Sequence, residues 1–249
     1  MNQTAGKIGH IAVKQPLSVE IFDRDGIEYC CHAERTLEEA CSELDVSPEE
    51  VTRALADPSG QFAPHQVDWN GSTCEFLILR ILRKEHADLK EEIRNLRVLA
   101  KGSSELHSSA DPELKISREL FEELAEELTA HMEAEEKTVF PALLEVELAY
   151  VGEGTQSLTP GWIPATLKRM SQEHRVAGRT LSLLCQETHA FHVPKGADPA
   201  YQEFYDGLTK LYGGIRHDFH VENDILFPRI AQMEMALLHE TKTAAPAHT

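Results

Sequence analysis

The fold of this chain is decided by the stretch HMEAEEKTVFP, residues 131–141. A second stretch, DFHVENDILFP at residues 218–228, aligns with it without a gap. In both, a glutamate stands four positions after the first residue, and the proline of a Phe-Pro pair follows six positions later. The four-residue spacing places the first residue and the glutamate on one helical face, one turn apart. Such a unit on two helices predicts a carboxylate-rich metal centre inside a helical bundle.

Two further histidines support this interpretation. A single His-x3-Glu pair is more often part of a solvated helix face than of a metal site. However, His86 and His174 lie in the middle of two other long helical patterns. Four helices that each offer an inward imidazole or carboxylate would form a dinuclear site. A lone histidine in a core has no such arrangement around it.

The overall composition limits the classes of partner. The chain has 249 residues, enough for one large domain or for a bundle with a small accessory module. Its net charge of −18 repels phosphate backbones, so we expect no nucleic-acid partner. No secretory signal and no apolar run of membrane-spanning length is evident, so we expect no membrane association. Five cysteines, two of them adjacent, argue against a disulfide framework and for a cytoplasmic protein.

The first part of the chain predicts a small helical domain. We expect a flexible N-terminus at 1–16, a helical domain with a Cys-Cys pair at 17–58, and a breaker-rich linker at 59–72. A first helix is predicted over Ser18–Asp23. Thr36 and Glu39 form a capping box that opens a second helix. Ser47, followed by proline, caps a third.

The rest of the chain predicts an all-α, up-down-up-down four-helix bundle over residues 73–239, followed by a disordered tail at 240–249. The expected helices are Cys74–Ala100, Lys115–Leu148, Pro164–Thr188 and Ala200–His239, with the first ended by Gly102-Ser-Ser and the second and fourth kinked near Pro141 and Pro228. Apolar residues recur with helical spacing in three of them. These stripes are Phe76, Leu79, Leu82, His86 and Leu89; Phe121, Leu124, Leu128, His131, Glu135 and Val139; and Leu167, Met170, His174, Ala177 and Leu181.

Inward stripes on four antiparallel helices would bring three imidazoles and two carboxylates together at mid-bundle. The candidate ligands are His86, His131, Glu135, His174 and Glu222. Imidazole and carboxylate together suit iron or manganese, and a glutamate can bridge two ions. No cysteine lies in these stripes, which disfavours zinc–thiolate and iron–sulfur sites there. We interpret Cys41, Cys74 and Cys185 as core residues.

The chain resembles the repair-of-iron-centres family, di-iron hemerythrin-like proteins with a short N-terminal cysteine-pair domain. The resemblance covers about residues 15–235. It rests on Tyr29-Cys30-Cys31 with the following Thr36-Leu-Glu-Glu-Ala-Cys, on His86 in Arg-Lys-Glu-His, on His131 with Glu135, on His174 in Gln-Glu-His, and on Glu222 before Asn-Asp-Ile-Leu-Phe-Pro.

This resemblance implies a hemerythrin-like bundle that holds two iron ions, oxo-bridged and also bridged by Glu135 and Glu222. Manganese or zinc is the alternative ion. The family's role implies repair or protection of iron–sulfur clusters under nitrosative and oxidative stress, by iron donation or by handling of nitric oxide. Nitric oxide or oxygen would be the small ligand, and iron–sulfur proteins the clients. Nitric oxide reduction would make the protein an enzyme, whereas a non-catalytic binder or sensor of oxygen, nitric oxide or iron is the alternative. A homodimer is left open.

One position departs from the family pattern. Where the fourth helix of the family carries a histidine, this chain has Asp218. Three outcomes are open: Asp218 binds in place of the histidine, His217 turns inward through a one-residue π-bulge, or the second ion lacks a protein ligand there and keeps a water or an open position. His220 lies about 200° around the helix from Asp218, so we expect it to face outward or towards the rim. An aspartate ligand should favour the ferric state and lower the reduction potential.

Cys30 and Cys31 have two interpretations. Adjacent cysteines are often small hydrophobic residues of a core. The family resemblance implies a function as thiol ligands, nitrosyl acceptors or redox thiols. Their reactivity would then depend on thiolate formation near a helix N-terminus.

Overall fold

The computed structural model describes residues 6–15, 17–27, 29, 35–44, 46–56, 71–107, 112–154 and 161–244. These residues form helices and no strand, apart from one isolated bridge between Lys7 and Thr36. The all-α expectation is confirmed. The chain divides into two compact units, the first comprising residues 1–73 and 216–228 and the second residues 74–215 and 229–249.

Short helices make up the N-terminal part of the first unit. They are α1 (Ile8–Lys14), α2 (Leu17–Arg24), α3 (Leu37–Leu44) and α4 (Pro48–Ala56). Helix α2 is the helix expected at residues 18–23, and Gly26 closes the following turn with a positive φ of 70°. Left-handed backbone of this kind favours glycine, which has no Cβ.

The predicted helix starts of α3 and α4 are confirmed. The backbone N–H of Thr36 donates to Glu39 Oε2 at 2.8 Å, and the N–H of Glu39 donates to Thr36 Oγ1 at 3.2 Å. This is the reciprocal pattern of a capping box. At α4, the N–H of Glu50 donates to Ser47 Oγ at 3.3 Å.

The N-terminal lead-in differs from its expected flexible state. Residues 8–14 form helix α1, in which Ile8 and Ala12 are buried. Their four-residue spacing gives the short helix one apolar face, and α1 contacts α2. Cys30 and Cys31 lie outside the described residues, as does most of the expected linker.

Residues 216–228, which belong to the first unit, include a buried arginine, Arg216. The Arg216 guanidinium lies 4.7 Å from the centroid of the Tyr29 ring and donates a hydrogen bond to the Ile27 carbonyl. A cation–π contact and a charge-assisted hydrogen bond compensate the arginine for its loss of hydration.

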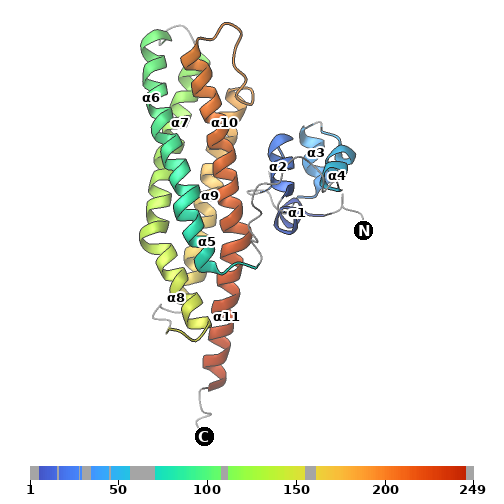
Figure 1. Cartoon of the computed structure of the whole chain (residues 1–249), viewed down its shortest axis with the longest axis vertical. Coiled ribbons are helices and arrows are strands. Elements are labelled where there is room, and N and C mark those ends of the chain that lie inside the picture. Colours follow the sequence, from blue (N-terminus) through green and yellow to red (C-terminus); the bar gives the residue numbers. More distant parts are fainter. Residues whose placement is uncertain are drawn as a thin grey trace. The chain divides into compact units, whose positions relative to one another are not determined.

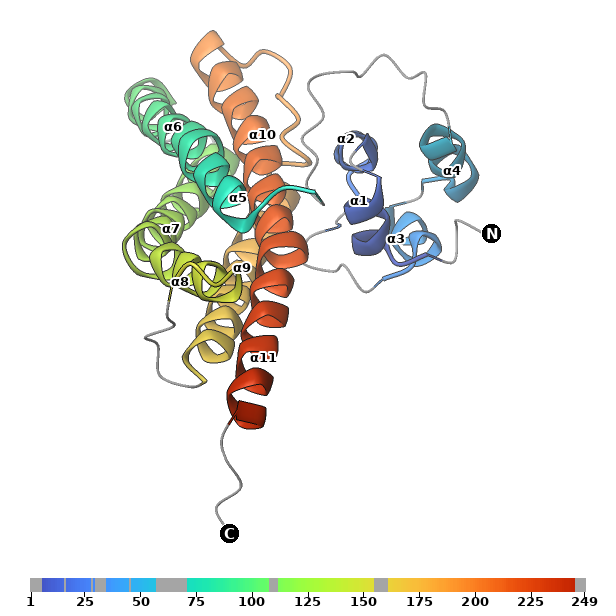
Figure 2. The same ribbon diagram turned by 60° about the horizontal axis from the view of Figure 1, so that its bottom comes forward.

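Four long helical rods follow the N-terminal helices among the described residues (Figure 1). They are α5 (Cys74–Arg80), η2 (Ile81–Glu85) and α6 (His86–His107); α7 (Pro112–Ala134), η3 (Glu135–Val139) and α8 (Phe140–Tyr150); α9 (Trp162–Glu187); and α10 (Pro199–His220), η4 (Val221–Leu226) and α11 (Phe227–Ala244). Successive rods alternate in direction, with α6 and α7 at one end of the bundle and α5 and α8 at the other (Figure 1). Figure 2 shows the same rods from nearer their ends.

The apolar stripes of the second and third rods are confirmed. Phe121, Leu124, Leu128 and Val139 are buried on the α7–η3 rod. On α9, the stripe Leu167, Met170, His174, Ala177 and Leu181 is buried. Helices α7 and α9 pack along each other, so His131 and His174 are brought together from neighbouring rods.

The first stripe was wrong at its N-terminal end. Phe76 and Leu79 are 47% and 37% exposed, whereas Leu77, Ile78 and Ile81 are buried. The π-helical segment η2, which begins at Ile81, separates residues 76–79 from His86. A π-bulge accommodates an extra residue in a turn, so counting backwards from His86 with the α-helical period points to the wrong face.

The other π-helical segments coincide with the two repeated stretches. Segment η3 begins at Glu135, and η4 contains Glu222. Each is followed by the Phe-Pro pair, with which helix α8 or α11 begins. The proline ring removes one helical donor, and a wider turn before it accommodates the loss. π-Bulges are frequent at functional sites, which draws attention to Glu135, Glu222 and His86.

The ends of two rods also differ from expectation. Helix α6 continues through Gly102-Ser-Ser to His107, and α11 continues to Ala244, into the expected tail. No described helix is long and apolar enough to cross a membrane.

Glu147 fixes the start of the first rod. Its Oε1 accepts a hydrogen bond from the Cys74 N–H at 2.7 Å, and its Oε2 accepts one from the Glu75 N–H at 2.6 Å. Both N–H groups belong to the first turn of α5, where helical donors have no partner within the helix. A carboxylate is also favoured there by the helix dipole. Glu147 thereby joins the end of the second rod to the start of the first.

Replacing Glu147 with alanine is expected to lower the free energy of unfolding by about 1–3 kcal/mol, because two donors at a buried helix start lose their acceptor. Urea unfolding measures the change. Glu145→Ala, at an exposed position of the same helix, is the control and should cost about 0.5 kcal/mol or less. Equal losses in the two variants would contradict the capping role.

Candidate metal centre

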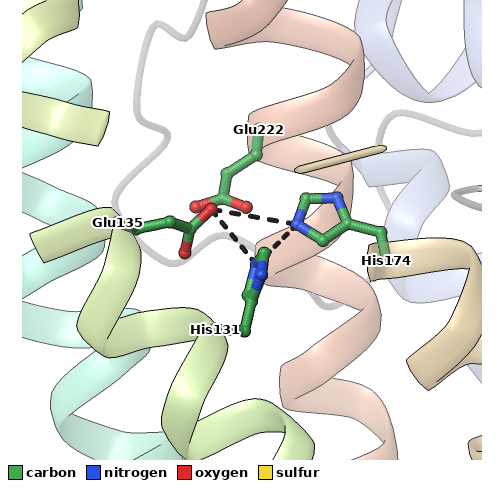
Figure 3. Close-up of side chains that lie close together, drawn as sticks. All are labelled: His131, Glu135, His174 and Glu222. Carbon is green, nitrogen blue, oxygen red and sulfur yellow. Dashed lines mark hydrogen bonds and ion pairs between the residues drawn. The ribbon is translucent and has the colours of Figure 1, made fainter. Parts of the chain in front are cut away.

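Two groups of buried side chains have the composition of a metal site. In each group, one ligand atom per residue lies within 4.8 Å of all the others. The first group is His131, Glu135, His174 and Glu222, shown in Figure 3, and the second is His86, Asp218 and Glu222. Glu222 belongs to both. The structure thus brings together all five histidine and glutamate residues predicted from the sequence, together with Asp218, one of the alternatives given for the position that departs from the family pattern.

Glu135 faces two sets of imidazoles with its two oxygens. Its Oε1 lies 3.1 Å from His131 Nε2 and 3.9 Å from His174 Nε2. Its Oε2 lies 3.5 Å from His86 Nε2. His131 and His174 also approach each other, with their Nε2 atoms 2.8 Å apart (Figure 3). One carboxylate therefore lies between a pair of imidazoles on one side and a single imidazole on the other.

Two of these imidazoles are hydrogen-bonded through Nδ1, the ring nitrogen that faces away from Glu135, to carboxylates outside the two groups. His86 Nδ1 lies 2.9 Å from Glu136 Oε1, and His131 Nδ1 lies 2.9 Å from Glu173 Oε2. A carboxylate can only accept, so in both histidines Nδ1 carries the proton and donates it. In the neutral imidazole the Nε2 lone pair then points towards Glu135. This is the usual support of a metal-binding histidine.

The electrostatic balance of the site favours an ionised Glu135. Burial alone would lower the pKa of His131, but the charge of Glu135 and its hydrogen bond outweigh burial and raise the pKa of His131 to about 10. Burial likewise opposes ionisation of Glu135, but His131 outweighs it and holds the pKa of Glu135 below its ordinary value. A proton on His131 here occupies the place that a cation would take.

Asp218 and the preceding His217 have different surroundings. Asp218 is buried and joins His86 and Glu222, whereas His217 is partly exposed and belongs to neither group. The π-helical segment of this rod begins after both of them, at Val221. The structure therefore places Asp218, and not His217, beside the other candidate ligands.

The expectation that His220 faces outward or towards the rim was wrong. Only 3% of His220 is exposed. Its Nδ1 lies 2.8 Å from Asp224 Oδ2, and its ring meets the Tyr29 ring edge-on with centroids 5.3 Å apart. The rule of about 100° per residue gives only the angle between two residues around the helix, and it could not indicate that the Tyr29 ring contacts His220.

The donor set fits iron. Buried carboxylate and imidazole donors from separate rods converge on a small volume, and no cysteine belongs to either group. Three buried carboxylates, Glu135, Asp218 and Glu222, provide negative charge that divalent or trivalent cations would compensate.

Sequence reasoning missed Glu136 and Glu173. Both stand next to a predicted ligand, Glu136 after Glu135 and Glu173 before His174. Adjacent residues on a helix point about 100° apart, so each reaches the histidine of another rod instead of the centre. A glutamate directly beside a predicted ligand, as in Glu135-Glu136 and Glu173-His174, was the sequence signal for such a role. Only the packing shows which histidine each glutamate contacts.

The chain is similar to known proteins along most of its length. Residues 77–230 match the Hemerythrin HHE cation binding domain, and residues 4–59 match a Domain of Unknown function (DUF542). The iron-sulfur cluster repair protein YtfE of Escherichia coli O157:H7 is 26% identical over 222 residues, 89% of this chain and 94% of that protein. YtfE of Pectobacterium carotovorum subsp. carotovorum (strain PC1) is 25% identical over 228 residues, 91% of this chain and 97% of its own length.

The first of these matches spans more than half of the chain and contains every residue of the two buried groups. The helical rods and the converging histidines and carboxylates agree with a cation-binding bundle. The chain therefore belongs to the hemerythrin HHE cation binding domain family, and it carries a DUF542 domain before the bundle.

Proposed function

We propose that this protein holds two iron ions in the bundle and uses them to repair or protect iron–sulfur clusters. The position of Glu135, with one oxygen towards His131 and His174 and the other towards His86, is the observation that carries the proposal. A carboxylate in this position can bind one ion with each oxygen. The name of the similar proteins, iron-sulfur cluster repair protein, supports the biological role.

The two ions would have different ligands. His131 and His174 would hold the first, and His86 with Asp218 the second, while Glu135 and Glu222 would bridge them. The second position would thus have one imidazole fewer and one carboxylate more. Bound iron would supply redox chemistry and the capacity to bind a small ligand. The protein's own residues would hold the ions, keep Nε2 of His86 and His131 directed inward, and exclude bulk water from a buried site.

Iron donation is the activity that we test first. Purified protein should contain about two irons per chain by elemental analysis. Incubated with an iron–sulfur enzyme that has lost iron from its cluster, it should restore that enzyme's activity and lose an equivalent amount of iron. Iron-loaded protein that restores no activity, beside a free ferrous salt control that does, would contradict donation.

Nitric oxide handling is the second candidate activity. The second ion would have His86, Asp218, Glu135 and Glu222 as its donor residues, and iron held by imidazole and carboxylate can keep open positions for a small ligand. Reduced, iron-loaded protein exposed to nitric oxide should then release nitrous oxide, which gas chromatography detects. Binding of nitric oxide without nitrous oxide release would favour a carrier or sensor. Release from the metal-free protein would show that the bundle site is not responsible.

Metal binding should depend on pH with a definite sign. The pKa of His131 is raised to about 10 in the metal-free site, so at neutral pH its imidazole carries a proton that a bound ion must displace. The apparent affinity should therefore fall as pH falls below that value, by about tenfold per pH unit for each displaced proton. Chelator competition between pH 6.5 and pH 8.5 measures it. An affinity independent of pH would contradict the prediction.

A further inference from the structure

A surface lysine, an outer glutamate and the buried His86 form a connected series from solvent to the candidate centre. Glu136 Oε1 lies 2.6 Å from Lys90 Nζ and 2.9 Å from His86 Nδ1. The opposite ring nitrogen, His86 Nε2, lies 3.5 Å from Glu135 Oε2. Lys90 is 38% exposed, Glu136 26% and His86 fully buried. We call these residues the Lys90 relay.

The Lys90 relay differs from its counterpart on the other side of Glu135. There, Arg169 Nη1 lies 3.0 Å from Glu173 Oε1, while His131 Nδ1 lies 2.9 Å from the other oxygen, Oε2. In the Lys90 relay the ammonium and the imidazole share a single oxygen. A cation on that oxygen reduces the electron density available to the imidazole N–H more directly than a cation on the second oxygen would.

His86 supplies the single imidazole of its group of candidate ligands. The group of His86, Asp218 and Glu222 contains one imidazole, whereas the other group contains two. Any change in the basicity or orientation of His86 therefore affects the single nitrogen donor of that metal position. Carboxylates behind metal-binding histidines fix the ring and raise the basicity of the metal-binding nitrogen.

We propose that Glu136 is a positioning residue for the metal position at His86, and that Lys90 sets the strength of its effect from the surface. Glu136 keeps the proton on Nδ1 and directs the Nε2 lone pair inward. Lys90 draws negative charge from the shared oxygen and so limits how basic His86 becomes. The inference rests on the proposed di-iron function and identifies residues that would tune one of its two positions.

Replacement of Glu136 by leucine removes the acceptor behind His86. The ferrous affinity of one of the two positions should weaken by roughly 10–100-fold, while the other stays within a few fold. Stepwise titration with anaerobic ferrous iron resolves the two positions. Glu136→Gln retains an amide oxygen that accepts from Nδ1, so it should recover part of this loss. Urea unfolding of the metal-free variants shows whether the fold is intact.

The reduction potential tests the part played by Lys90. Glu136→Gln removes the anion and should raise the potential of the loaded centre, whereas Lys90→Met frees that anion and should lower it. If Lys90 acts through Glu136, the double variant Lys90→Met/Glu136→Gln should have the same reduction potential as Glu136→Gln alone. Direct action of the two charges at a distance would give additive shifts.

Two exposed pairs provide matched controls. Lys84→Met removes a lysine of the same helical rod that pairs with Asp88, and Glu133→Gln removes a glutamate that pairs with Lys137. Both should leave the affinity unchanged and move the potential less than the relay variants. Additive shifts, or shifts no larger than in these controls, would overturn the proposal. A wild-type protein that binds no iron would instead overturn the proposed function.

Discussion

Glu135→Ala is expected to remove both ions, so that the iron content falls from about two per chain to near zero. Each oxygen of Glu135 faces a different imidazole set, so a single substitution takes one donor from each position. Loss of a residue behind a ligand typically costs 10–100-fold in affinity, and loss of a shared ligand should cost more than about a hundredfold at both positions. Elemental analysis after desalting, with chelator competition, measures this.

The neighbouring glutamate provides the control for this substitution. Glu133 lies on the same rod, is exposed and pairs with Lys137. Glu133→Ala removes the same group and should retain both ions. Unfolding of metal-free Glu135→Ala by urea checks that the bundle is intact. A variant that folds and still binds two ions would show that Glu135 does not bridge them.

Substitution of Asp218 is expected to act on one position only. Asp218 groups with His86 and Glu222 and is absent from the other group. Asp218→Ala should therefore retain one tightly bound iron and lose the second. The His131 and His174 position keeps its donors and should bind with an affinity within a few fold of the wild type.

Asp218→His tests the electronic effect of the aspartate. It should retain both ions and raise the reduction potential of the centre, because a neutral imidazole stabilises the ferric state less than a carboxylate does. A redox titration of the loaded protein measures the change. Asp206→His, at an exposed position of the same helix, is the control and should leave the potential unchanged. An unchanged potential in Asp218→His would refute aspartate ligation.

Local sequence signals predicted much of this protein correctly. The capping box at Thr36 and the cap at Ser47 lie within a few residues of their partners, so the sequence alone contains the whole interaction. On the second and third rods the stripe residues that precede His131 and His174 are buried as predicted, because an uninterrupted α-helix connects them to these histidines. The same holds for the His131 and Glu135 pair, whose four-residue spacing fixes a common face.

Where the helical period changes, extrapolation from the sequence failed. Phe76 and Leu79 were assigned to the buried face because the π-helical turn at residues 81–85 could not be seen in the apolar pattern. The burial of His220 was missed for a different reason, because the Tyr29 ring that contacts it lies far from it in the sequence.

The sequence by itself determined the all-α class, the repeated His/Asp-x3-Glu units and the residue types able to bind a cation. These properties depend on composition and on spacing within one helix, which the chain carries locally. Only the tertiary structure decided that Asp218 joins His86 and that Glu136 and Glu173 stand behind the histidines. Contacts between rods depend on how packed helices face one another across the bundle, and a period along one chain segment does not specify that.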